Sequence, residues 1–307
     1  MGTTERLACF LVETGYNNLP QEVVRVAKRA FLDGMGVALA GSQEEAGRII
    51  AHHVKEQGGA KECRVLGNRW RVPAPAAALA NGIMAHALDY DDYAPGWVAH
   101  PTAAILPAVL ALGERGHISG KEALEAYVLG FEVGARAGYG AGRRHYEAGF
   151  HSTATLGTLG AAAASAKLLR LSIPETRMAL GIAASEAAGL RQNFGSMTKP
   201  FHAGNAARGG VTAALLAQQG FTASEDILDG PQGFVHVLAG EGHFEKMLDG
   251  LGETFDILSP GLEMKPYPCC RGTHRCLDAM FALLKERPFS PDEVEAVECR
   301  TSDIVPQ

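Results

Sequence analysis

Apolar residues recur at helical spacing along most of the chain. In residues 19–41 they fall on one stripe that follows a proline: Val23, Val24, Ala27, Ala30 and Phe31. This spacing predicts a helix with one buried face, because residues three and four apart share a side of a helix. Similar patterns predict helices over 44–57, 73–87, 101–116, 119–140, 152–171, 173–189 and 202–220. The fold is therefore expected to be mainly α.

Two regions interrupt this helical pattern. Residues 62–72 hold two β-rich runs around Gly67 and Asn68, which predict a small hairpin. From about residue 250 prolines and glycines become frequent, a helix is expected over 273–286, and alternation over 294–302 predicts a strand. We expect a large all-helical domain over 1–255, then the start of a smaller α+β domain over 256–307. Since a strand needs a partner, this second domain is expected to be incomplete and the chain truncated.

The composition excludes several classes of protein. Charged residues make up 20% and the net charge is −6, so the chain lacks the basic surface typical of nucleic-acid-binding proteins. The sequence shows neither a signal peptide nor an apolar run of about 20 residues, and its six cysteines are too few for a disulfide scaffold. A cytoplasmic protein without nucleic-acid or membrane partners is expected. The 37 glycines and the many alanines predict closely packed helices.

The densest group of ionisable residues lies between two predicted helices. Residues 86–100 contain His86, Asp89, Asp91, Asp92 and His100. A solvated acidic loop, a metal site and a proton-transfer cluster are the three interpretations. Metal is the least favoured, because the aspartates lack the spacing of a calcium loop and the cysteines lack that of a zinc site. Loops on rigid scaffolds often carry catalytic groups, which keeps the third interpretation open.

Two predicted helix starts carry further candidate residues. His151 precedes a helix of small residues, where free backbone N–H groups favour an anion and Thr153 could add a hydroxyl donor. Lys199 precedes a proline and a helix, with His202 and Arg208 close behind. Because a lysine at a helix N-terminus opposes the helix dipole, binding of a substrate carboxylate is as reasonable as a solvated loop.

Residues 265–274 form the last candidate segment, with Lys265, Tyr267, Cys270 and His274. A cysteine nucleophile with His274 as its base is one alternative, and nothing in the sequence favours Cys270 over its neighbour Cys269. Taken together, the four segments supply the base, the acid and the cations that proton abstraction beside a carboxylate requires.

Four strings carry a resemblance to a known family. They are NGIMAHALDYDD with HPTAAILPAVLALGE, GFHSTATLGTLGAAAASAKLL, MTKPFHAGNAARGGVTAALLAQQGFT with ILDGPQGF, and KPYPCCRGTH. In these strings the chain resembles the MmgE/PrpD family, which contains 2-methylcitrate dehydratase, cis-aconitate decarboxylase and iminodisuccinate epimerase. The resemblance implies a helical domain with an α+β lid, a homodimer, and chemistry on small polycarboxylates without metal or organic cofactor.

The resemblance also implies roles for individual residues. Asp89, His100, His151, Lys199 and His274 are implied to be catalytic. Lys265 is implied to bind the substrate. From the candidate segments themselves, we expect the following residues to bind it as well: Thr153, Arg208, Tyr267 and Cys270. The decarboxylases of the family carry histidine where this chain has Cys270, a departure that favours an epimerase-like or an uncharacterised branch of the family over a decarboxylase.

The expected function is therefore a cofactor-independent lyase or isomerase. It would remove a proton alpha to a carboxylate of a small di- or tricarboxylate, in the manner of 2-methylcitrate dehydratase or iminodisuccinate epimerase. The alternative is a catalytically inactive, truncated family member that serves as a helical dimerisation module.

Overall fold

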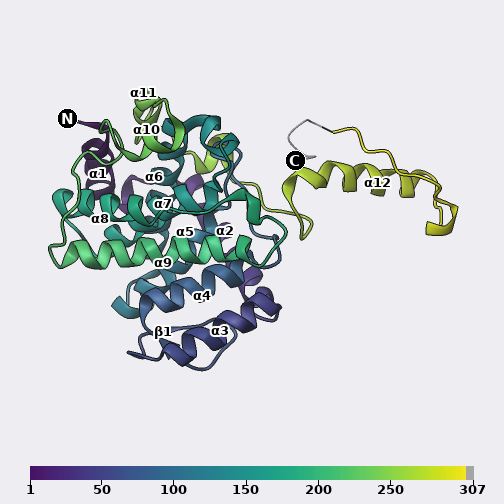
Figure 1. Ribbon diagram of the computed structural model, residues 1–307, viewed down its shortest axis with the longest axis horizontal. Coiled ribbons are helices and arrows are strands. Elements are labelled where there is room, and N and C mark those ends of the chain that lie inside the picture. The colour runs from purple at the N-terminus through teal and green to yellow at the C-terminus, as the bar shows by residue number, and fades with distance from the viewer. Residues whose placement is uncertain (302–307) are drawn as a thin grey trace.

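The computed structural model describes residues 1–301 and is built almost entirely of helices (Figure 1). The first six are α1 (Thr3–Glu13), α2 (Gln21–Gly41), α3 (Glu45–Gln57), α4 (Ala74–His86), α5 (Pro101–Gly116) and α6 (Gly120–Glu147). The others are α7 (Ser152–Leu168), α8 (Ile173–Glu186), α9 (Thr198–Gln218), α10 (Phe234–Ala239), α11 (Phe244–Leu248) and α12 (His274–Glu286). Strands β1 (Cys63–Arg64) and β2 (Arg71–Val72) pair antiparallel. The predicted mainly α fold and the small hairpin are thus confirmed.

Most helix boundaries lie within a few residues of those expected. Ser119 caps α6: its side chain accepts from the Glu122 N–H, and the Glu122 side chain in turn accepts from the Ser119 backbone N–H. Helix α1 was not predicted. Helix α6 continues beyond residue 140 through a kink at Gly142, whose φ of +62° is a backbone angle that suits glycine.

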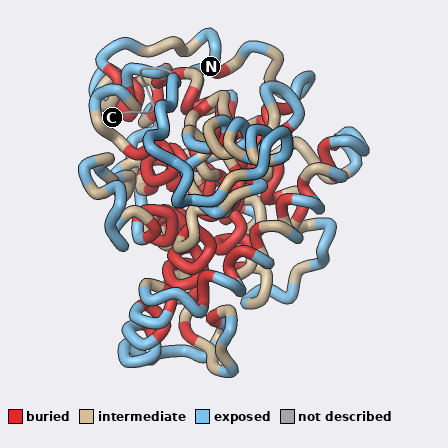
Figure 2. The backbone as a smooth tube through the Cα atoms, turned by 90° about the vertical axis from the view of Figure 1, so that its right-hand side faces the viewer, coloured by how far each residue is buried: buried red, intermediate tan, exposed pale blue. Residues whose placement is uncertain are grey.

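Helix α7 lies at the centre of the helical body and explains the abundance of small residues. Every residue from 152 to 166 is buried, and α5, α6, α8 and α9 all pack against it. Gly130 of α6 meets Gly160 of α7 so closely that a Cβ on Gly130 would lie 2.6 Å from the Gly160 carbonyl oxygen. Figure 2 shows the buried backbone concentrated in this central region. The prediction of closely packed helices is therefore confirmed.

Helices α4 and α9 cross at a second pair of glycines. A Cβ on Gly204 would lie 2.3 Å from the carbonyl oxygen of Leu79, and a Cβ on Gly82 would lie 2.6 Å from the Gly204 Cα. Backbone therefore touches backbone at this crossing. The contact matters for the site described below, because α4 ends at His86 and α9 carries Lys199 in its first turn.

The C-terminal part of the chain leaves the helical body after residue 265, and α12 extends away from it (Figure 1). An antiparallel bridge between Tyr93 and Glu263 fastens the start of this part to the loop between α4 and α5. Helix α12 is amphipathic, and Phe281 and Leu283 on it are exposed. Among residues 1–301, no helix is long and apolar enough to cross a membrane.

The strand predicted over 294–302 is not formed in the described part of that range. A capping box joins Ser290 and Glu293, but residues 294–301 have no regular secondary structure and are exposed. The alternation of apolar and polar residues suits a strand, yet a strand forms only where a neighbour completes its hydrogen bonds. Within residues 1–301 no strand pairs with this segment.

Candidate functional site

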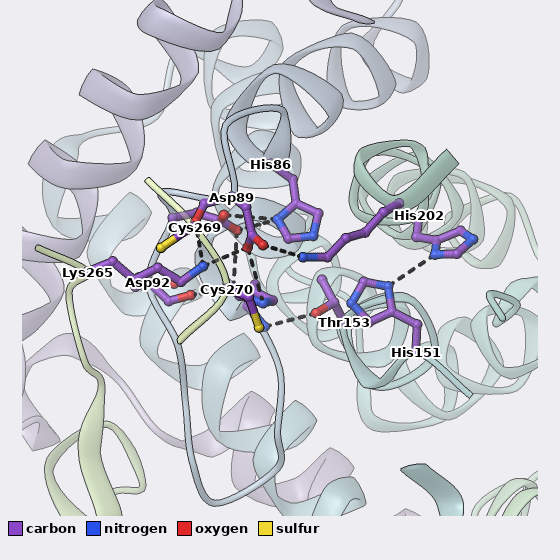
Figure 3. Close-up of polar contacts among 12 residues, drawn as sticks. His86, Asp89, Asp92, His151, Thr153, His202, Lys265, Cys269 and Cys270 are labelled. Carbon is purple, nitrogen blue, oxygen red and sulfur yellow. Dashed lines mark hydrogen bonds and ion pairs between the residues drawn. The ribbon is translucent and has the colours of Figure 1, made fainter. Parts of the chain in front are cut away.

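The loop of residues 87–100 carries several residues of the candidate site and lies near the crossing of α4 and α9. Helix α4 ends at His86, and Asp89 follows with a φ of +48°, a left-handed conformation that aspartate tolerates better than most residues. The loop ends at His100, which is the N-cap of α5, and Pro101 begins that helix. These turns bring the side chain of His100 close to those of His86 and Asp89. Figure 3 shows His86 and Asp89 pointing into this region.

Asp89 is shared by two lysines from distant parts of the chain. The Nζ atom of Lys199 lies 2.7 Å from one carboxylate oxygen, and that of Lys265 lies 2.7 Å from the other. Lys265 also donates to the Asp89 backbone carbonyl at 2.6 Å, and its side chain is completely buried. Burial alone would raise the pKa of Asp89, yet His100 and the two lysines hold it well below its ordinary value. This Asp89–Lys199–Lys265 triad therefore carries one net positive charge at neutral pH.

The tautomer of His100 follows from its hydrogen bonds. Its Nδ1 lies 2.8 Å from the backbone carbonyl oxygen of Asp92, which can only accept, so Nδ1 carries the proton. The lone pair then belongs to Nε2, which lies 3.9 Å from a carboxylate oxygen of Asp89. Burial and then the neighbouring cations, Lys265 among them, lower the pKa of His100 to about 3 against the opposing pull of Asp91. His100 is therefore a neutral imidazole with a free lone pair.

His86 and Asp91 form a completely buried pair behind His100. Both carboxylate oxygens of Asp91 lie within 2.9 Å of His86 Nδ1. Burial would raise the pKa of Asp91, but His86 and His100 lower it to about 2, so the carboxylate is ionised and His86 Nδ1 donates. The other ring nitrogen of His86 is buried and has no partner among the described residues. The His86 ring lies 4.7 Å from that of His100 and 5.8 Å from that of His151.

Asp92 points in the opposite direction, into the core. It accepts from the Thr102 N–H at 3.3 Å and shares a short hydrogen bond with the Thr102 hydroxyl, which in turn meets the Tyr127 hydroxyl at 2.5 Å. Burial, with the nearby Asp91 charge, raises the pKa of Asp92 to about 8. The side chain is thus a neutral carboxyl that supports the loop, while its backbone carbonyl orients His100.

His151 is placed beside this cluster by the start of α7. It is the N-cap of the helix, and its Nδ1 lies 3.1 Å from Nδ1 of His202 on α9, so one ring must donate to the other. Burial lowers the pKa of both imidazoles. Thr153 is fully buried and accepts from the His100 N–H at 3.0 Å. Thr153 therefore holds the backbone of His100 in place.

A cavity of about 1000 Å³ opens in front of these residues. His100, His151 and Lys199 line it on the side of the helical body, together with Arg191 and Tyr146. The opposite wall is formed by α12, the turn that precedes it, and residues 297–301. The cavity is large enough for a small organic acid and presents cations and neutral imidazoles to it.

The remaining predicted residues lie at the edge of this site or away from it. Cys270 is exposed and lines the cavity, whereas Arg208 is paired at 3.6 Å with Glu186 outside it. Tyr267 donates to Asp278 on α12 at 2.8 Å. His274 is buried and hydrogen-bonded through Nε2 to the Cys269 backbone carbonyl at 3.1 Å. Among residues 1–301, no hydrogen bond joins His274 to a thiol.

Four side chains of the cluster lie close enough to chelate a metal ion. His86, Asp89, Asp91 and His100 each offer a ligand atom, and these atoms lie within 4.8 Å of one another. Both oxygens of Asp89 already contact lysine ammonium groups, and Asp91 accepts from His86. A cation would have to displace these donors, so the charge of the site favours an anion instead.

Sequence reasoning assigned no role to three of the polar residues in or behind the cavity wall: His86, Asp91 and Arg191. The signal for the pair was present, because a histidine at the end of a helix and an aspartate five residues later can meet across the turn. Arg191 belongs to a short 3-10 turn, Arg191–Asn193, between α8 and α9, where no periodic pattern drew attention to it.

Comparisons with known proteins identify the family of the chain. Residues 5–247 match the model of the MmgE/PrpD N-terminal domain. The chain is 32% identical to cis-aconitate decarboxylase of Mus musculus over 98% of its own length and 64% of that protein. It is 32% identical to cis-aconitate decarboxylase of Homo sapiens, with the same two shares. The identity to cis-aconitate decarboxylase of Aspergillus terreus is 30%, over 94% of this chain and 61% of that protein. The chain thus spans less than two thirds of the length of these relatives.

Proposed function

Because the chain belongs to the MmgE/PrpD family, we propose that it is a lyase or isomerase that acts on a small di- or tricarboxylate by proton transfer at a carbon next to a carboxylate. The observation that carries this proposal is the neutral, correctly oriented His100 beside a positively charged triad in the wall of a large cavity. The named activity of the relatives, decarboxylation of cis-aconitate, is also chemistry on a small tricarboxylate.

Lys199 is the proposed contact for the substrate carboxylate at the reacting end. It is the member of the triad that lines the cavity, and an ammonium has three donors, of which Asp89 uses one. An incoming carboxylate would balance the net charge of the triad. Negative charge that develops on this carboxylate as the neighbouring carbon loses a proton would be stabilised by the same ammonium.

His100 is the proposed base. Nε2 would take the proton from the carbon, and the resulting imidazolium would face the Asp89 carboxylate at 3.9 Å. Loss of a hydroxide from the adjacent carbon then completes a dehydration. Return of a proton from the opposite face, for which His151 in the cavity wall is the proposed donor, completes an epimerisation. In a decarboxylation the carbon dioxide leaves first, and the carbon would then take up a proton that originates from solvent.

The test is exchange of carbon-bound hydrogen in deuterated water, followed by NMR with 2-methylcitrate, citrate, cis-aconitate and iminodisuccinate. We expect exchange or turnover with at least one of them. His100→Gln should slow it by about 100-fold or more, since a positioned general base contributes on this scale. His52→Gln, on the exposed face of α3, is the matched control and should leave the rate unchanged.

The pH dependence gives a second readout of the same step. Because the pKa of His100 is lowered to about 3, the base is already free at pH 5, and kcat/KM should not fall with an apparent pKa near the ordinary 6.5. Absence of exchange with all four acids would reject the proposal and favour a catalytically inactive helical module.

A further inference from the structure

The cations that line the cavity differ in whether a carboxylate of the protein already neutralises them. Lys199 is paired with Asp89, Arg271 with Glu263 at 2.5 Å, and Arg300 with Glu298 at 3.0 Å. Within residues 1–301, two of the lining cations, Arg191 and Arg275, have no carboxylate partner. Arg275 is exposed on α12, whereas Arg191 is half-buried on the side of the helical body, so Arg191 is a charged group inside the site whose partner must come from solvent or from a ligand.

Arg191 is nevertheless held firmly in place. Its guanidinium carbon lies 4.0 Å from the centre of the Tyr146 ring, and its Nη1 donates to the Tyr146 backbone carbonyl at 3.1 Å. Stacking on an aromatic ring fixes the plane of a guanidinium and leaves its outer N–H groups available. The Nε atom of Arg191 is buried and has no acceptor among the described residues. The donors of Arg191 that a ligand can reach are therefore those of its outer Nη atoms.

The backbone directs Arg191 and His151 to the same side. Phe150 and Leu190 form an antiparallel bridge, the His151 N–H donates to Gly189 and the Arg191 N–H donates to Gly149. Side chains alternate along paired strands, so the residues on either side of the bridge pair share one face. His151 and Arg191 are such residues, and both line the cavity.

We propose that Arg191 binds a second carboxylate of the substrate and thereby selects di- and tricarboxylates over monocarboxylates. This inference rests on the proposed function, in which Lys199 holds the carboxylate at the reacting carbon. A guanidinium presents two parallel N–H groups that match the two oxygens of a carboxylate. The distal carboxylate would thus complete the hydrogen bonding of Arg191, while the proximal one meets the triad.

The test measures binding without turnover, by titration calorimetry with propane-1,2,3-tricarboxylate, which is saturated and lacks a leaving group. Arg191→Gln should weaken this binding by about 10- to 100-fold, the range for a charged hydrogen-bonded pair. Binding of propionate, which has a single carboxylate, should be equally weak in both proteins. Arg143→Gln, an exposed arginine of α6, is the matched control and should bind like wild type.

Arg191→Lys keeps the charge but loses the two-pronged donor, so its affinity should lie between those of wild type and Arg191→Gln. It also serves if the glutamine variant fails to fold. In the exchange assay both variants should raise KM far more than they lower kcat, because the distal contact is made equally before and during proton transfer. Unchanged tricarboxylate affinity in Arg191→Lys and Arg191→Gln would overturn the assignment of Arg191, even where wild type catalyses exchange. If wild type catalyses no exchange but the Arg191 variants bind the tricarboxylate more weakly, the assignment of Arg191 stands and only the proposed chemistry is rejected.

Discussion

The crossing of α4 and α9 leads to a quantitative prediction for Gly204→Ala. The new Cβ would lie 2.3 Å from the Leu79 carbonyl oxygen and 2.9 Å from the Ile83 amide nitrogen. Carbon and oxygen settle at about 3.3 Å or more, so the helices must separate by about 1 Å. Overpacking of this kind costs roughly 1–3 kcal/mol, and the obstacle here is backbone that cannot rotate away. The higher helix propensity of alanine returns up to about 1 kcal/mol.

We therefore expect a net loss of about 2 kcal/mol, which lowers Tm by roughly 3 °C in a chain of 307 residues, because the entropy of unfolding grows with chain length. The assay is thermal unfolding followed by far-UV circular dichroism. Gly36→Ala is the matched control, because this exposed position in α2 has no atom within 4 Å of the added Cβ. It should raise Tm slightly through propensity alone. If Gly204→Ala melts at or above the wild-type temperature, the close crossing is not as described.

Three further predictions concern the buried titratable groups. Burial lowers the pKa of His145 to about 4, so below about pH 6.5 the unfolded chain binds a proton that the native state does not. The free energy of unfolding should therefore fall as the pH drops from 6.5 toward 4, and His145→Gln should reduce this fall in urea titrations. Burial raises the pKa of Asp92 from 3.8 to about 8, so its stabilising contribution is complete below about pH 4 and is lost as the pH rises through 8; Asp92→Asn should remove this slope. His86→Asn keeps a donor for Asp91, whereas His86→Leu does not, so the exchange rate should be higher in the asparagine variant; equal rates would show that the pair does not position His100.

Much of the helical fold could be predicted because each helix has a local cause. The apolar stripe of α2, the capping box at Ser119 and the proline that begins α5 are all visible within a few residues. Helix α1 was missed because its burial depends on distant groups. Asp229 accepts from the N–H groups of Thr3 and Thr4 at its N-terminus, more than 220 residues away in the chain.

The candidate site was predictable only in part, for a similar reason. Asp89, His100, His151, Lys199 and Lys265 come together as the motifs suggested. The backbone turn at Asp89 decides which of the loop aspartates faces the lysines. No local pattern in the sequence distinguishes Asp89 from Asp92 in this respect. Arg191 could not be predicted as a site residue, because its position depends on the pairing of residues 149–151 with 189–191, segments about 40 residues apart.

The contact between Lys265 and Asp89 has a mechanical consequence. Lys265 belongs to the segment that leads to α12, and its ammonium is anchored inside the helical body by the Asp89 carboxylate and carbonyl. Asp89, which neutralises one of the two lysines in the site, thus also anchors the C-terminal part of the chain to the helical body. Asp89→Ala should abolish the exchange activity and speed proteolysis between residue 265 and α12. Lys199→Ala keeps the contact between Lys265 and Asp89, so it should abolish the exchange activity without faster proteolysis.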